Sequence, residues 1–154
     1  MSEIFVISCK NVAVSAPQDV LAAFGSATKK LQLLAVELAA NGQATVGNYP
    51  ITIRYLAPTV SNGSGGTSVT PVNVNPGGAS PTLTARANDT TQASGSSIVD
   101  IVASQFNPIN GYYNMPPVPV GDEPQAAISG AFVLSLDAVT GTLNISATMW
   151  LREI

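Results

Sequence analysis

The sequence has no histidine and only one cysteine among its 154 residues. Without histidine, the chain can form neither a Ser-His-Asp triad nor a Cys-His pair, and a histidine-based zinc site is excluded. With Cys9 alone, an intrachain disulfide and a cysteine cluster for zinc or an iron–sulfur centre are excluded too. We therefore expect no metal and no cofactor, and these absences argue against an enzyme.

Charged residues are scarce as well, because they make up 10% of the chain against about 25% in an average soluble domain. Six basic and nine acidic residues give a net charge of −3, which argues against a nucleic acid as partner. Two explanations remain open for the low charge. Either a β-rich fold presents a neutral polar surface, or other subunits cover much of the surface, since interface cores are depleted of charge.

The N-terminal segment and the longest apolar stretch both bear on where the protein is found. Glu3 stands where a signal peptide carries basic residues, so export is not expected. The apolar stretch 20–40 is interrupted by Lys29 and Lys30, which argues against a membrane span and a membrane partner. The sequence therefore predicts synthesis in a reducing cytoplasm, where Cys9 stays a free thiol.

Short β-branched or alternating segments run through most of the chain and predict strands. They lie at 4–9, 49–55, 69–74, 98–102, 131–136 and 143–151. The clearest alternation is in 143–151, where every second residue is apolar and small or aliphatic. Because the turn residues 138–141 join the last two segments, the pattern predicts that they form a hairpin.

Residues 19–41 are ambiguous, since their Ala- and Leu-rich composition favours helix while Gly25 and Ser26 interrupt them. We expect two strands, 20–24 and 31–39, because the rest of the chain is consistently β. At most one short helix is expected within 17–41.

Residues 58–97, hereafter the excursion, are dominated by Gly, Ser, Thr, Asn and Pro. Spaced apolar residues within it indicate an ordered segment with one strand. Seven or eight strands with long polar loops predict an all-β fold, a jelly-roll-like β-sandwich that spans residues 1–154 as a single domain.

Three short motifs invite a catalytic or binding interpretation, and each lacks what the chemistry requires. Ser26 and Lys29 match Ser-x-x-Lys without the Ser-Asp-Asn and Lys-Thr-Gly partners of that site. Asp122 and Glu123 are adjacent, so on an extended chain they point in opposite directions. The glycines at 63–66 have no lysine of a phosphate loop. No catalytic residue is predicted.

The most informative aromatic cluster is the segment 106–117. Tyr and Met are enriched in interface cores, and prolines keep a segment extended. The tyrosines either pack on the domain's own core, form a subunit contact or belong to a glycan site. We expect a protein contact formed by Tyr112, Tyr113, Met115, Ile4 and Phe5.

The middle of the chain carries a series of turn and strand signals. The series begins with Gly65-Gly66-Thr67-Ser68-Val69-Thr70-Pro71, continues with Val72-Asn73-Val74-Asn75-Pro76-Gly77-Gly78 and Ala87-Asn88-Asp89-Thr90-Thr91, and ends with Gly111-Tyr112-Tyr113 and Met115-Pro116-Pro117. Over residues 49–154 this order resembles small structural proteins of tailed bacteriophages. Members of that group carry more charge near the Pro-Gly turn than this chain does.

The resemblance implies a head decoration, or cement, protein with a jelly-roll-like β fold. Such a protein forms a homotrimer and clamps neighbouring copies of the major capsid protein on the outer surface of the virion, after synthesis in the host cytoplasm. No individual residue role is carried over. The alternative is a glycan-binding β-sandwich module of a phage tail or adhesion apparatus. It is disfavoured because the single tryptophan, Trp150, lies in the final strand segment and not in a loop.

Overall fold

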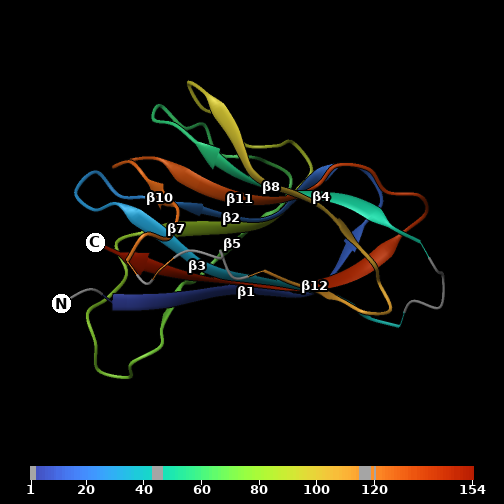
Figure 1. The fold of residues 1–154 in the computed structure, drawn as a ribbon, viewed down its shortest axis with the longest axis horizontal. Helices are drawn as coiled ribbons and strands as arrows, with labels where there is room; N and C mark the ends of the chain where they lie inside the picture. Colours follow the sequence, from blue (N-terminus) through green and yellow to red (C-terminus); the bar gives the residue numbers. More distant parts are fainter. Residues whose placement is uncertain (1–2, 43–46, 115–118, 120) are drawn as a thin grey trace.

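The computed structural model describes residues 3–42, 47–114, 119 and 121–154, which form two antiparallel sheets packed face to face (Figure 1). Sheet A contains, in order, β6 (Val72–Asn73), β1 (Glu3–Val14), β12 (Leu143–Glu153) and β3 (Leu31–Ala40), with β9 (Tyr112–Asn114) and β10 (Gln125–Ala126) on the outer edge of β3. Sheet B contains, in order, β5 (Thr67–Val69), β7 (Thr84–Asp89), β2 (Gln18–Phe24), β11 (Ala131–Leu136), β4 (Tyr49–Leu56) and β8 (Ile98–Phe106).

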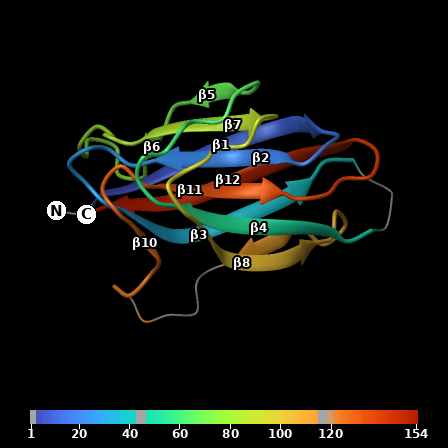
Figure 2. The ribbon, with the colours of Figure 1, turned by 90° about the horizontal axis from the view of Figure 1, so that it is seen from above.

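The strand pairs are nested along the chain. β1 pairs with β12, β2 with β11, β3 with β9, and β4 with β8. The chain is thus one long hairpin rolled into two layers, in which the pairs β1–β12 and β3–β9 lie in sheet A and the pairs β2–β11 and β4–β8 lie in sheet B (Figure 2). This is the jelly-roll arrangement, so the predicted fold class is confirmed.

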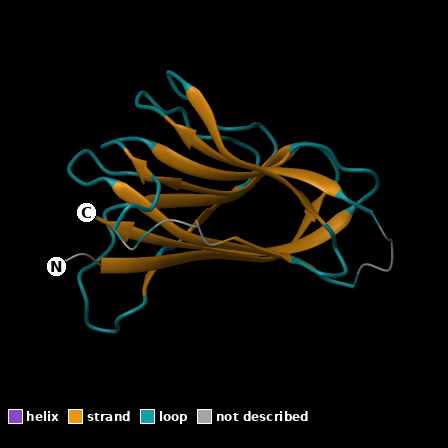
Figure 3. Cartoon of the chain, viewed as in Figure 1, coloured by secondary structure: helices purple, strands orange, loops and turns teal. Residues whose placement is uncertain are grey.

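The described residues contain strands, turns and loops but no helix (Figure 3). The two predicted strands within 19–41 are confirmed as β2 and β3. Helical propensity does not decide this segment because every residue of β2 is buried between other parts of the chain. The described residues therefore include no helix that is long and apolar enough to cross a membrane.

The core lies between the sheets and follows the alternation of β12, whose residues 143, 145, 147, 149 and 151 are all buried. Burying each large aliphatic side chain contributes about 1.5–3 kcal/mol to stability. Cys9 is a free thiol on β1 and packs against this core. It behaves there as a small apolar residue.

The predicted hairpin of 131–136 and 143–151 is wrong. β11 lies in sheet B between β2 and β4, whereas β12 lies in sheet A between β1 and β3. Residues 137–142 therefore cross from one sheet to the other. The two strands differ in burial, since all six residues of β11 are buried while β12 buries every second residue. This difference shows that both faces of β11 are covered by other parts of the chain.

The excursion contains the three strands β5, β6 and β7, and not the one that was expected. Part of it packs over the outer face of sheet B, where Ala93 and Val60 join a second apolar cluster. The members contributed by the sheet are Ala22, Phe24, Leu56, Ala131 and Val133. The chain thus covers the middle of this face itself, while β6 crosses to the edge of sheet A.

Candidate docking face

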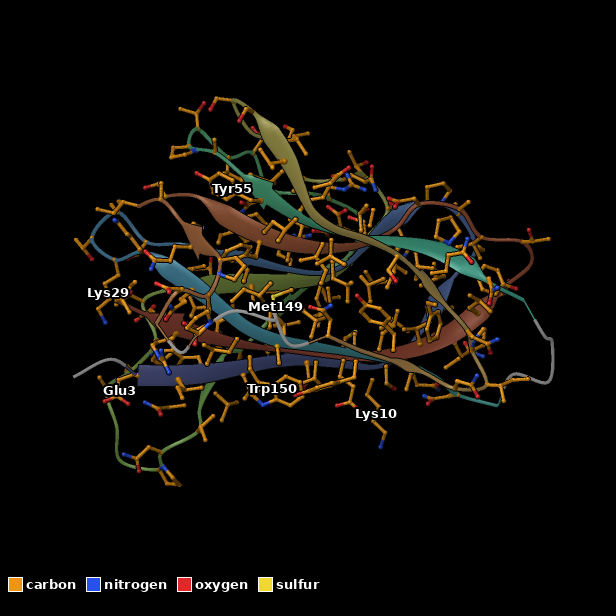
Figure 4. The ribbon with its side chains drawn as sticks, in the orientation of Figure 1. Glu3, Lys10, Lys29, Tyr55, Met149 and Trp150 are labelled. Atoms are coloured by element: carbon orange, nitrogen blue, oxygen red, sulfur yellow. The ribbon has the colours of Figure 1, made fainter. Side chains whose placement is uncertain are left out.

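The outer face of sheet A carries apolar side chains that remain accessible to solvent. Val6 on β1 lies opposite Val72 on β6 and opposite Trp150 on β12, and Trp150 lies opposite Ala35 on β3. Directly opposed residues of antiparallel strands share one face of a sheet. Figure 4 shows Trp150 pointing away from the sandwich, while its neighbour Met149 points into the core. An apolar row therefore crosses four strands.

Beside this row the surface is hollowed into a groove of about 310 Å³. Its lining residues are Ile4, Leu34, Ala35, Val74, Tyr113 and Trp150. Tyr113 and Val74 are 58% and 54% exposed. The register of β3 shifts opposite Trp150 and Leu151, and Leu34 is the residue that the shift leaves unpaired with β12. We call these six residues, together with Val6 and Val72, the docking face.

Charged side chains lie around the docking face and not within it. Glu37 is exposed and lies opposite both Thr148 and Tyr113. On the other side of the Trp150 row, Arg152 lies opposite Ile4 and donates a hydrogen bond to Gln32 over 3.0 Å. A neutral centre with a charged rim is the composition of a protein interface.

Backbone and side-chain hydrogen bonds hold β6 against the edge of sheet A. The Val74 amide donates to the Ile4 carbonyl over 2.9 Å. Asn73 Nδ2 donates to Glu3 Oε2 over 2.9 Å and to the Ala79 carbonyl over 2.9 Å. The bond from Asn73 lowers the pKa of Glu3. These bonds fix Val72 and Val74 at the border of the docking face.

The structure separates the predicted contact residues. Ile4 and Tyr113 line the same groove, so both are placed where a partner can reach them. Tyr112 lies opposite Leu38 and packs against the core, and its buried hydroxyl has no hydrogen-bond partner of ordinary geometry. Burial raises the pKa of Tyr112, and the side chains of Ser104 and Asn114 act in the opposite direction.

The prediction that Phe5 contacts a partner is wrong, because its side chain is fully buried and faces the core. It follows Ile4 on β1, and neighbouring residues of a strand point to opposite faces. Phe5 therefore supports the sheet and does not reach a partner. Met115 lies outside the described residues.

Sequence reasoning missed Trp150, Leu34 and the two valines of the excursion as parts of this face. The signal for Trp150 was present in the alternation of 143–151. If the odd-numbered residues face the core, an aromatic residue at 150 must lie on the outside. The valines carried no comparable signal, since only the pairing of β6 with β1 brings them to sheet A.

Residues of the short motifs that invited a catalytic or binding interpretation have structural roles. The Lys29 ammonium binds the Glu153 carboxylate over 2.9 Å. Glu123 accepts hydrogen bonds from Gln32 and from the Gly121 amide. On the outer face of sheet B, Arg54 binds Asp137 over 2.7 Å. Asp137 also accepts a hydrogen bond from the Thr52 hydroxyl over 2.6 Å. The described residues hold no group of three or more side chains suited to a metal ion.

Comparison of the chain with protein-family models, with curated proteins and with solved structures gives no match.

Proposed function

We propose that the protein is a structural component of a phage particle that binds the outer surface of the capsid, as a decoration or cement protein. In this proposal it is not an enzyme, and its partner is the major capsid protein. The observation that supports it is the docking face, where the only tryptophan and an exposed tyrosine border an apolar groove on the outer face of sheet A. Contiguous exposed apolar patches with a polar rim mark protein interaction sites.

The composition of the groove favours a protein partner over a glycan. Tryptophan and tyrosine are the residues that most often dominate binding energy at protein interfaces. A sugar needs several precisely placed polar groups to satisfy its hydroxyls. The six described lining residues include no acidic or amide side chain, and their polar side-chain groups are the Tyr113 hydroxyl and the Trp150 indole N–H.

The jelly-roll fold by itself does not distinguish the two candidates, because both viral capsid proteins and lectins use it. The glycan-binding alternative keeps one argument, since Trp150 and Tyr113 are aromatic residues beside a hollow. The homotrimer implied by the resemblance remains a prediction.

The test is co-sedimentation with capsids that lack the protein. We expect Trp150→Ala to weaken binding by at least about 2 kcal/mol, or roughly thirtyfold in Kd, and Tyr113→Ala to weaken it less. Ile109→Ala is the matched control, because Ile109 is 57% exposed and does not line the groove. Wild-type occupancy by the Trp150 variant would contradict the docking site. Binding to a bacterial polysaccharide without binding to capsids would favour the alternative.

A further inference from the structure

Two stretches of the excursion, residues 60–66 and 90–96, lie together over the outer face of sheet B, and we call them the cover. Apolar members of the cover pack on the sheet. The two stretches are joined by isolated bridges, each closed by two backbone hydrogen bonds of 2.9–3.1 Å, which pair Ser61 with Ser94 and Ser64 with Thr91. The cover contains no ionisable side chain. Any effect of pH on its attachment must therefore come from the groups beneath it.

Two buried carboxylates hold the cover to sheet B. Asp19 on β2 lies directly opposite Asp89 on β7, and each residue is 1% exposed. Asp19 Oδ2 accepts a hydrogen bond from the Ala93 amide over 2.7 Å. Asp89 Oδ1 accepts one from the Gly66 amide over 3.0 Å. Because both donors belong to the cover, its release breaks a bond to each carboxylate and brings water to both.

Among the described residues, the two carboxylates have one cation in contact with them. Arg86 binds Asp89 with two nitrogens, Nε at 2.8 Å from Oδ2 and Nη2 at 2.7 Å from Oδ1. Asp19 has neutral donors, which are the Ala93 amide and the Ser135 hydroxyl, each at 2.7 Å. An ionised carboxylate that is buried without a contacting cation is costly. The closed cover therefore disfavours the ionised form of Asp19.

The other charged groups near Asp19 do not replace a contacting cation. Arg54 on β4 favours the ionised form of Asp19 from a distance, and its guanidinium is bound to Asp137, 2.7 Å away. Asp89 on β7 acts in the opposite direction. Burial is the largest effect and raises the pKa of Asp19, in agreement with the geometry.

We propose that the cover is a pH-sensitive strap over sheet B, which is held tightly when Asp19 is protonated and loosens when Asp19 is ionised. This inference does not depend on a capsid partner. Protonation costs no hydrogen bond, because Oδ1 can donate the proton to the Ser135 oxygen while Oδ2 still accepts from the Ala93 amide. With the cover open, Asp19 is in water, where the ordinary pKa is about 3.9. Between that value and the higher pKa of the closed state, each pH unit favours opening by up to about tenfold.

Hydrogen exchange at the Ala93 amide tests the proposal. The readout is the protection factor, which corrects for the intrinsic effect of pH on exchange. We expect it to fall by at least about threefold between about pH 4 and about pH 7 in the wild type. In Asp19→Asn the side chain stays neutral and can make both bonds, so protection at Ala93 should not change with pH. The Asn41 amide is the control, because it donates to the Asn144 carbonyl over 2.7 Å on sheet A and should not show the fall.

A carboxyl carbon NMR titration of the wild type identifies the group and does not need the variant to fold. We expect the fall in protection at Ala93 to level off at the pH at which Asp19 titrates. Protection that stays constant or increases with pH in the wild type would overturn the proposal. The same fall in a folded Asp19→Asn variant would overturn it too, and so would a fall that follows the titration of another carboxyl group.

Discussion

Glu153 is a buried carboxylate near the end of the chain that joins three separate segments. Its Oε1 accepts bonds from the Leu83 amide over 2.6 Å, the Thr82 amide over 2.9 Å and the Thr82 hydroxyl over 2.8 Å. Its Oε2 binds Lys29. Burial alone would raise the pKa of Glu153, and the bonds from Lys29, Thr82 and Leu83 outweigh this effect, so the pKa is lowered.

We expect Glu153→Gln to lower the free energy of unfolding by about 1–3 kcal/mol at neutral pH, because the substitution weakens bonds to buried donors. The folded pKa of Glu153 lies below the unfolded value of about 4.3. Its contribution is therefore complete above that value and is lost as the pH falls through the folded pKa. Urea denaturation at several pH values measures this. A difference between variant and wild type that grows on acidification would contradict it.

The effect of Asp19 on the pH dependence of stability has the opposite sign to that of Glu153. Burial raises its pKa, although Ser135 and the Ala93 amide each donate a hydrogen bond to it over 2.7 Å. The stability linked to a raised carboxyl pKa is present below the unfolded pKa and is lost as the pH rises. The acid response of the whole protein therefore combines carboxylates with raised and with lowered pKa values, and the comparison with the Glu153 variant isolates one of them.

At the scale of elements, the short strand β6 positions part of the docking face. Asn73 makes three side-chain bonds there, including one in which its Oδ1 accepts from the Asn75 amide over 2.8 Å. Because the bonds of Asn73 brace the segment next to the Val74 amide, we expect Asn73→Ala to speed hydrogen exchange at Val74 about tenfold, which corresponds to about 1.4 kcal/mol.

The control for this prediction is Asn75→Ala. It changes the same residue type in the same segment and keeps the bonds that Asn73 makes to Glu3 and Ala79. Exchange in β7 should not change in either variant, since its amides belong to sheet B. Equal acceleration at Val74 in both variants would show that Asn73 does not hold β6.

The sequence predicted the strands better than their partners. The positions of β4, β11 and β12 follow from short-range alternation and apolar runs, which a single sequence contains. Pairing in a jelly roll joins segments far apart in the chain, such as β1 and β12. The adjacent segments 131–136 and 143–151 therefore looked like a hairpin and were not. The three strands of the excursion were underestimated because their apolar residues are sparse and are stabilised by contacts with distant strands.

The candidate site was predicted in part for the same reason. Tyr113 and Ile4 were singled out from residue type, and their meeting in one groove depends on sheet order. Tyr112 and Phe5 were assigned to the same contact although alternation places them on the core side. Of the three interpretations of the tyrosines, packing on the domain's own core holds for Tyr112, while Tyr113 is exposed and its contact stays a prediction.

At the scale of the whole molecule, the two outer faces of the sandwich differ. The excursion covers the middle of sheet B, and the apolar docking face remains on sheet A. With charged residues at 10% of the chain, we expect the proposed binding through this face to depend mainly on apolar burial. Salt shortens the distance over which exposed charges interact to about 10 Å at 0.1 M and about 3 Å at 1 M. It leaves the stabilisation from apolar burial largely intact. Binding to capsids should therefore persist at several hundred millimolar salt.

The fluorescence of Trp150 tests the docking face most directly, because it is the only tryptophan in the chain and it borders the groove. The measurement is a titration with capsids that lack the protein, at low salt and again at several hundred millimolar salt, with capsids alone as the blank. We predict that binding shifts the Trp150 emission to shorter wavelength and reduces its quenching by acrylamide, to a similar extent in both buffers. Binding with unchanged Trp150 emission and quenching, or release of the protein by the added salt, would contradict the account.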